Sequence, residues 1–129
     1  TYTFMKNTIR LALATAAMVM AFAVGSMAQD CRAKTVAFTD GAATIQAKTG
    51  GCVKFRFMVE PGQRAKVTLR SSDNKARFDL QDGAEDETGS TYYEGQTSFD
   101  KVIEFDEFTI EVFGTSSVGF TLNVKVIDQ

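Results

Sequence analysis

The residues that could carry chemistry in this chain are two cysteines, a cluster of carboxylates and a set of basic side chains. The 129 residues contain no histidine, which excludes a histidine general base, a histidine-based catalytic triad and a histidine metal site. A pair of carboxylates could in principle hydrolyse a glycoside, but the acids here fall on outward strand positions and in an open polar segment. The sequence therefore predicts a non-enzymatic protein without a cofactor.

The first 28 residues have the pattern of a secretory signal peptide. Lys6 and Arg10 precede an apolar run, 11–24, and the small residues Ser26 and Ala28 fit a cleavage site before Gln29. A helix of about 14 apolar residues is about 21 Å long, too short for a bilayer core of about 30 Å. We expect a periplasmic or secreted protein with no membrane association after cleavage, in which 29–129 form one domain.

The two cysteines, Cys31 and Cys52, both follow the predicted leader. An even number of cysteines in an oxidising compartment favours a disulfide, and closing a loop of about 22 residues would stabilise the fold by about 3 kcal/mol. A lipid-modified Cys31 would need a small residue before it, but Asp30 occupies that position. We predict a Cys31–Cys52 disulfide rather than a metal or redox site.

Apolar and polar residues alternate along most of the chain after residue 29. In 53–57, for example, Val53, Phe55 and Phe57 alternate with Lys54 and Arg56. This period of two residues predicts half-buried strands at 35–38, 43–47, 52–59, 65–71, 76–81, 108–112 and 120–126. About seven to nine short strands separated by turn residues predict an all-β, antiparallel, jelly-roll-like sandwich, preceded only by the signal-peptide helix.

Two connections are informative. Pro61-Gly62-Gln63 predicts a hairpin between the strands on either side of it. Ile103 and Phe105 share one parity whereas Phe108 and Ile110 have the other. Both groups can face one core only if a bulge or tight turn lies at 106–107, so we expect two strands joined there by a very short connection.

Charge is segregated along the predicted mature chain, whose formal charge is −4. Residues 30–78 hold 10 basic and 4 acidic residues, and 79–129 hold 2 basic and 12 acidic ones. The two halves could pair across the sheet and give a mixed, solvated surface. Alternatively, basic side chains at outward positions of adjacent strands could form a stripe for an anionic polysaccharide or lipid phosphate. Nucleic acid is excluded because the protein is acidic and no aromatic residues interleave on that face. The stripe would consist of Lys54, Arg56, Lys66 and Arg70.

The segment 81–96 is the longest uninterrupted polar stretch, and we predict a loop there. It contains several carboxylates and two adjacent tyrosines, which are good interface anchors in a polar setting. An exposed acidic loop would also steer a cationic partner toward it. A calcium site and a solvated loop without a partner are the alternatives. The predicted partner-binding residues are Asp86, Glu87, Ser90, Tyr92, Tyr93 and Glu94.

The segment 53–81 also carries a resemblance to a known family. An aromatic strand leads through Val59-Glu60-Pro61-Gly62-Gln63 into a Val67-Thr68-Leu69-Arg70-Ser71 strand. This pattern resembles the bacterial pre-peptidase C-terminal domain and the related periplasmic inhibitors of i-type and g-type lysozymes, where a Gly-Gln turn precedes a Val-x-Leu-x-Ser-like strand. The strands at 108–112 and 120–126 resemble the last two strands of these families.

The resemblance implies an exported bacterial sandwich that binds another molecule, with a lysozyme as the first expectation. In i-type inhibitors a Ser-Gly followed closely by a Tyr enters the lysozyme cleft, whereas the matching stretch here, 105–108, reads Phe-Asp-Glu-Phe. No family residue is therefore carried over. Because lysozymes are commonly basic, the acidic segment with Tyr92 and Tyr93 is the predicted contact. The alternatives are an accessory domain that binds cell-wall or surface polysaccharide through the basic stripe, and a structural envelope protein.

Overall fold

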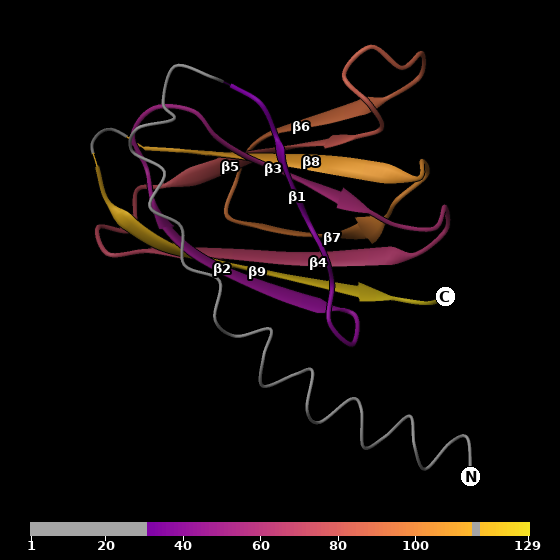
Figure 1. Cartoon of the computed structure of the whole chain (residues 1–129), viewed down its shortest axis with the longest axis horizontal. Helices are drawn as coiled ribbons and strands as arrows, with labels where there is room; N and C mark the ends of the chain where they lie inside the picture. The colour runs from indigo at the N-terminus through magenta and orange to yellow at the C-terminus, as the bar shows by residue number, and fades with distance from the viewer. Residues whose placement is uncertain (1–30, 115–116) are drawn as a thin grey trace, which may run out of the picture.

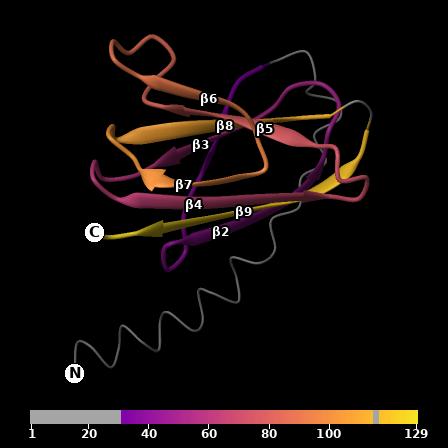
Figure 2. The same ribbon diagram turned by 180° about the vertical axis from the view of Figure 1, so that it is seen from behind.

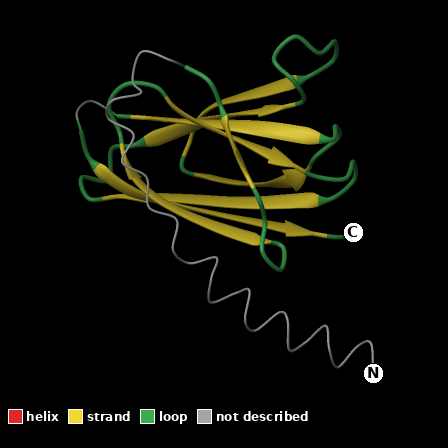
Figure 3. Cartoon of the chain, in the orientation of Figure 1, coloured by secondary structure: helices red, strands yellow, loops and turns green. Residues whose placement is uncertain are grey.

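A computed structural model describes residues 31–114 and 117–129, and these residues form nine strands and no helix (Figures 1 and 3). The predicted signal peptide lies outside the described residues. Within them, no helix is long and apolar enough to cross a membrane. The strands are β1 (Lys34–Val36), β2 (Ala42–Lys48), β3 (Val53–Met58), β4 (Arg64–Ser71), β5 (Arg77–Asp82), β6 (Thr91–Gln96), β7 (Ser98–Val102), β8 (Glu107–Phe113) and β9 (Gly119–Ile127).

The strands form two sheets. One has five strands in the order β1-β3-β8-β5-β6, and the other has four in the order β2-β9-β4-β7. In Figures 1 and 2, β3, β5, β6 and β8 run along the upper part of the molecule, and β2, β4 and β9 run along the lower part. All neighbouring strands are antiparallel except β1, which pairs with β3 in parallel. The predicted all-β sandwich is confirmed.

The core lies between the sheets and follows from the alternation in the sequence. In β4, Ala65, Val67 and Leu69 are buried, and the residues between them are exposed. The largest side chains at the centre include Phe57 and Phe108, whose rings stack with their centroids 5.1 Å apart. Burying a large apolar side chain contributes about 1.5–3 kcal/mol. Packing of the inward residues fixes the strands of both sheets, and the strands in turn fix where the outward side chains are attached.

Seven of the eight strand-to-strand connections change sheets, and β5–β6 is the exception. Two of these seven bear on the sequence predictions. The predicted hairpin at 61–63 is wrong, because β3 belongs to the five-stranded sheet and β4 to the four-stranded sheet. The chain crosses there and bonds to another crossing: the Gly62 amide donates to the Ile103 carbonyl, and the Ile103 amide donates to the Gln63 carbonyl, both at 2.8 Å. A change of sheet also explains the change of parity between Ile103 and Phe108. The strand β7 ends at Val102, β8 begins at Glu107, and the short connection between them carries the chain from one sheet to the other.

The disulfide between Cys31 and Cys52 is confirmed, with the two Cα atoms 5.1 Å apart. It ties the segment before β1 to the residue that precedes β3. Because β1 is a short edge strand that pairs only with β3, the bond holds it in register at one end.

Two further predictions are wrong. The segment 81–96 is not one loop, because β5 continues to Asp82 and β6 occupies Thr91–Gln96, which leaves a turn at 83–90. The four residues of the predicted basic stripe do not share a face, because β3 and β4 lie in different sheets. Lys54 and Arg56 point outward from the five-stranded sheet, whereas Lys66 and Arg70 point outward from the four-stranded one.

Candidate functional site

A groove of about 520 Å³ lies on the outer face of the five-stranded sheet. Its floor consists of outward side chains from four neighbouring strands, so the two-residue period of each strand places them side by side. The segment 31–33 and the connection 84–86 flank this floor. The floor residues are Lys54 and Arg56 of β3, Glu107, Thr109 and Glu111 of β8, Asp79 and Gln81 of β5, and Tyr92 of β6.

Acidic side chains predominate in the groove. Its lining holds five carboxylates and three basic groups, for a formal charge of −2. The groove therefore has the charge and the concave shape to receive a cationic side chain of a partner. The carboxylates belong to Asp79, Glu85, Asp86, Glu107 and Glu111, and the basic groups to Arg32, Lys54 and Arg56.

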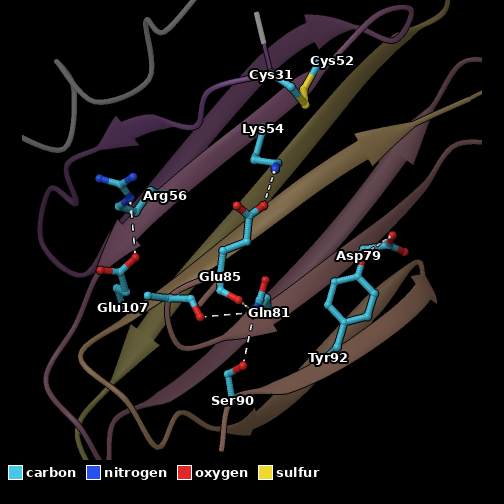
Figure 4. Close-up of polar contacts among 11 residues, drawn as sticks. Cys31, Cys52, Lys54, Arg56, Asp79, Gln81, Glu85, Ser90, Tyr92 and Glu107 are labelled. Carbon is cyan, nitrogen blue, oxygen red and sulfur yellow. Dashed lines mark hydrogen bonds and ion pairs between the residues drawn. A yellow bond between two sulfur atoms is a disulfide. The ribbon is translucent and has the colours of Figure 1, made fainter. Parts of the chain in front are cut away.

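Ion pairs cross the groove and its rim (Figure 4). The Lys54 ammonium lies 3.2 Å from a carboxylate oxygen of Glu85, which links β3 to the connection after β5. The Arg56 Nε lies 3.5 Å from a carboxylate oxygen of Glu107, without a hydrogen bond to any described residue. Each pair joins a base from the first half of the chain to an acid from the second half. These contacts agree with the interpretation that the two halves pair across the sheet.

Tyr92 stands at the edge of the groove in a fixed orientation. Its hydroxyl donates to Oδ2 of Asp79 at 2.7 Å, and the Gly95 amide donates to Oδ1 of the same carboxylate at 2.9 Å. The pairing of β5 with β6 shifts register at this point, and Gly95 has a φ of 63°, so Asp79 also fixes a bulge in β6. The hydrogen bond to the carboxylate stabilises the neutral phenol and raises the pKa of Tyr92 to about 12.

The two tyrosines do not form a paired anchor, because neighbouring residues of a strand point to opposite faces. Tyr92 is 51% exposed beside the groove. Tyr93 is half-buried and packs edge-to-face on Phe99, with ring centroids 5.0 Å apart. The Lys101 ammonium lies 5.9 Å from the centroid of the Tyr93 ring. Tyr93 thus packs at the side of the core, and its role in a partner contact stays a prediction.

The other predicted site residues have distinct positions. Asp86 is exposed and lines the groove, and Glu94 is exposed on β6. Glu87 accepts from the Ala84 amide at 3.0 Å, and Ser90 accepts from the Gln81 side chain at 3.2 Å. Glu87 and Ser90 thus hold the 83–90 turn in shape, which fixes the carboxylates on its surface.

A buried carboxylate anchors the neighbouring connection. Asp82 is 3% exposed, and its two oxygens accept from the amides of Glu104 at 2.8 Å and Phe105 at 3.1 Å. The Phe105 ring in turn lies so close to Gly83, whose φ is +112°, that a Cβ there would come within 3.1 Å of it. The sequence did not identify Asp82 as an anchor. Asp82 takes the last inward position of β5, where an apolar residue would be expected, and only its burial in the structure distinguishes it from the other aspartates.

The end of the sandwich at which Asp82 and the connection 103–106 lie is acidic. The connections 59–63, 83–90 and 103–106 contain six carboxylates and no basic residue. Backbone hydrogen bonds join the first connection to the third, including one from the Val59 amide to the Asp106 carbonyl at 3.0 Å. A cationic partner would therefore meet a continuous, well-ordered acidic border next to the groove. Its carboxylates are Glu60, Glu85, Asp86, Glu87, Glu104 and Asp106.

The calcium alternative has no ligand set among residues 31–114 and 117–129. Three potential metal ligands lie within 4.8 Å of one another at one place there, formed by Cys31, Cys52 and Glu111. Both cysteines are consumed by the disulfide. The carboxylates of 81–96 do not converge on a common point.

Comparison with known proteins gives a match in structure only. No protein-family model matches the sequence, and no curated protein sequence matches it. The fold is similar to that of PliG from Aeromonas hydrophila, a periplasmic inhibitor of g-type lysozyme, with a TM-score of 0.57, 16% identity, and coverage of 74% of this chain and 97% of that one. PliG from Salmonella Typhimurium, also a periplasmic inhibitor of g-type lysozyme, matches with a TM-score of 0.50 and 12% identity over 74% of this chain and 99% of that one. The chain therefore shares the fold of these inhibitors.

Proposed function

We propose that this protein is an exported, non-enzymatic inhibitor that binds a lysozyme in the periplasm, with g-type lysozymes as the first target. The observation that carries this proposal is the match in fold to two g-type inhibitors over nearly their whole length. The acidic groove and border add charge complementarity, because lysozymes are commonly basic. The resemblance to the pre-peptidase C-terminal domain stays a prediction.

The geometry suggests how such an inhibitor would work. Long-range attraction from the acidic border would accelerate the encounter with a basic enzyme. A lysine or arginine of the enzyme would then enter the groove between Asp86 and Glu111, against the ring of Tyr92. Because Asp79 already fixes Tyr92 and Asp82 already fixes the neighbouring connection, little conformational entropy would be lost on binding.

The direct test is a titration of lysozyme activity with the purified protein. Goose-type, chicken-type and invertebrate-type enzymes should be assayed in parallel on peptidoglycan. We expect near-stoichiometric inhibition of a g-type enzyme that weakens as the salt concentration rises. Absence of inhibition of all three classes would overturn the proposal.

Variants locate the contact surface. The double substitution Asp86→Asn, Tyr92→Ala removes one groove carboxylate and the exposed ring, and we expect inhibition to weaken about 30-fold or more if these residues are hot spots. Asp100→Asn is the matched control, because Asp100 is an exposed acid on the other sheet. Equal losses in both proteins would show that the groove is not the contact surface.

A further inference from the structure

The outer face of the four-stranded sheet is basic although the protein as a whole is acidic. Alternation in β2, β4, β7 and β9 turns five basic side chains and one carboxylate outward. We refer to the five as the basic face: Lys48, Arg64, Lys66, Arg70 and Lys125. The sheet-forming residues of the groove, in contrast, carry an excess of acid on the opposite side of the sandwich.

Most of these basic groups have no acidic partner. The one carboxylate, Asp100, is bonded to Arg64. Lys48, Lys66, Arg70 and Lys125 are exposed, and none of them forms an ion pair with a residue in the described ranges. On the other sheet, in contrast, Lys54 and Arg56 both form ion pairs with glutamates. Pairing across the chain therefore uses Lys54 and Arg56 on one face and leaves most of the bases on the other face unpaired.

The register adds a repulsive contact. Lys66 of β4 lies directly opposite Lys125 of β9, and the neighbour of Lys125 on its other side is Ala42 of β2. On its own other side Lys66 lies opposite Asp100 of β7, whose carboxylate is already paired with Arg64. Directly opposite residues have Cβ atoms about 5 Å apart, and like charges at that position destabilise a sheet. Asp100 offsets part of this repulsion at Lys66, but the other cross-strand neighbour of Lys125 is an alanine, so an anion placed over both ammonium groups would relieve what remains.

The shape and the remaining side chains indicate the kind of anion. The four basic groups without an acidic partner project from three adjacent strands, and Lys66 and Arg70 are about 13 Å apart along β4. Between them lie hydroxyl and amide groups, which can donate hydrogen bonds to phosphate oxygens. The groove lies on the other sheet, and no aromatic residue on this face offers a ring on which a sugar could stack. The intervening residues are Thr44, Gln46, Thr68, Thr121 and Asn123.

We propose, contrary to the expectation from the sequence of no membrane association, that the basic face binds a membrane surface that contains anionic phospholipids. A planar array of exposed cations matches a plane of phosphate groups better than it matches a single extended polymer. Each basic residue near an anionic bilayer strengthens binding by about fivefold, so four groups together give a substantial, salt-sensitive attraction. The contact is peripheral, because the centre of the face has no large apolar side chain to insert.

The test is co-sedimentation of the exported protein with lipid vesicles. Vesicles of phosphatidylcholine alone are compared with vesicles that contain one part phosphatidylglycerol to two parts phosphatidylcholine. We expect binding only to the anionic vesicles and its loss when the salt concentration is raised to about 0.5 M. Binding to both kinds of vesicle, or to neither, would overturn the proposal.

Two double variants identify the surface. Lys66→Glu, Lys125→Glu should reduce vesicle binding at least about tenfold, and the neutral pair Lys66→Gln, Lys125→Gln should reduce it less. The matched control Lys75→Glu, Lys101→Glu makes the same change in charge at exposed lysines that do not point outward from this sheet. Melting curves confirm that each variant is folded. Equal losses in the two glutamate variants, or retention on a soluble anionic polysaccharide without binding to anionic vesicles, would contradict the assignment.

Discussion

Two aspartates of β5 set the local geometry of the candidate site. Asp79 is at an outward position and holds both Tyr92 and the bulge of β6. Asp82 is at the end of the strand and holds the amides of the connection that follows β7. Both carboxylates serve the protein's own backbone and side chains, so a partner would have to engage other carboxylates, such as Asp86 and Glu111 of the groove.

The first prediction concerns the titration of Tyr92. Asp79→Asn removes the carboxylate that accepts the phenol hydrogen bond, so we expect the pKa of Tyr92 to fall from about 12 toward its ordinary value of about 10. Because the folded-state pKa is the higher one, this contact stabilises the protein fully below about pH 10, and the contribution is lost as the pH rises to about 12. Ultraviolet absorbance of tyrosinate measures the change, and Tyr93→Phe assigns the signal. An unchanged titration in Asp79→Asn would contradict it.

The second prediction concerns Asp82. Asp82→Ala leaves the part-buried amides of Glu104 and Phe105 without their acceptor, and we expect the free energy of unfolding to fall by about 1–3 kcal/mol. Asp82→Asn should cost less, because its carbonyl oxygen still accepts one of the two hydrogen bonds. Urea denaturation of the three proteins gives the comparison. Equal stability of Asp82→Ala and the parent protein would show that the anchor is unimportant.

At the scale of the elements, periodicity predicts strands that bury several side chains. The strands β3, β4, β8 and β9 each place three inward apolar residues in the core, and their positions were predicted closely. The edge strand β6 was missed, and the strand expected to carry Ile103 and Phe105 lies earlier in the chain, as β7. Tyr93 is the one half-buried aromatic residue of β6, and Phe99 is the one buried residue of β7, so neither sequence shows alternation.

Periodicity also does not report which sheet a strand joins. The alternation in β3 and in β4 is equally regular, yet the chain changes sheets between them. This explains why the basic residues of both strands were grouped into one stripe. The tyrosine pair was misplaced for a related reason: in a loop both rings could reach a partner, whereas in β6 they point to opposite faces. Asp86 and Tyr92 were predicted and do lie together at the groove.

The third prediction concerns the disulfide. Replacing both cysteines with serine should lower the free energy of unfolding by about 3 kcal/mol, because the loop between positions 21 residues apart is no longer closed in the unfolded chain. Hydrogen exchange should accelerate most at the amides of β1, which pairs only with β3. Addition of a reductant should destabilise the parent protein and leave the double-serine variant unaffected. Equal sensitivity of both would contradict the prediction.

At the scale of the whole molecule, the charges are sorted onto different surfaces. The groove and the connections at one end are acidic, and the outer face of the four-stranded sheet is basic. The sandwich places these surfaces on opposite sides of the core. The net charge therefore conceals two separate surfaces of opposite sign.

The fourth prediction follows from this separation. Lys66→Glu, Lys125→Glu should reduce binding to anionic vesicles at least about tenfold and leave the inhibition of a lysozyme unchanged. Asp86→Asn, Tyr92→Ala should do the reverse. Vesicle co-sedimentation and the lysozyme titration, applied to both variants, measure the two effects. A variant that loses both properties while it remains folded would show that the two surfaces act as one.

The position of Cys31 has a consequence for when the groove is complete. One flank of the groove is the segment 31–33, which is joined at one end to β1 by the backbone and is fastened at Cys31 by the bond to Cys52. Such bonds form in oxidising compartments and are rare where thiols are kept reduced. A newly made chain in the cytoplasm would therefore have an unfastened flank, and the binding surface would mature only after the chain has left the cell interior.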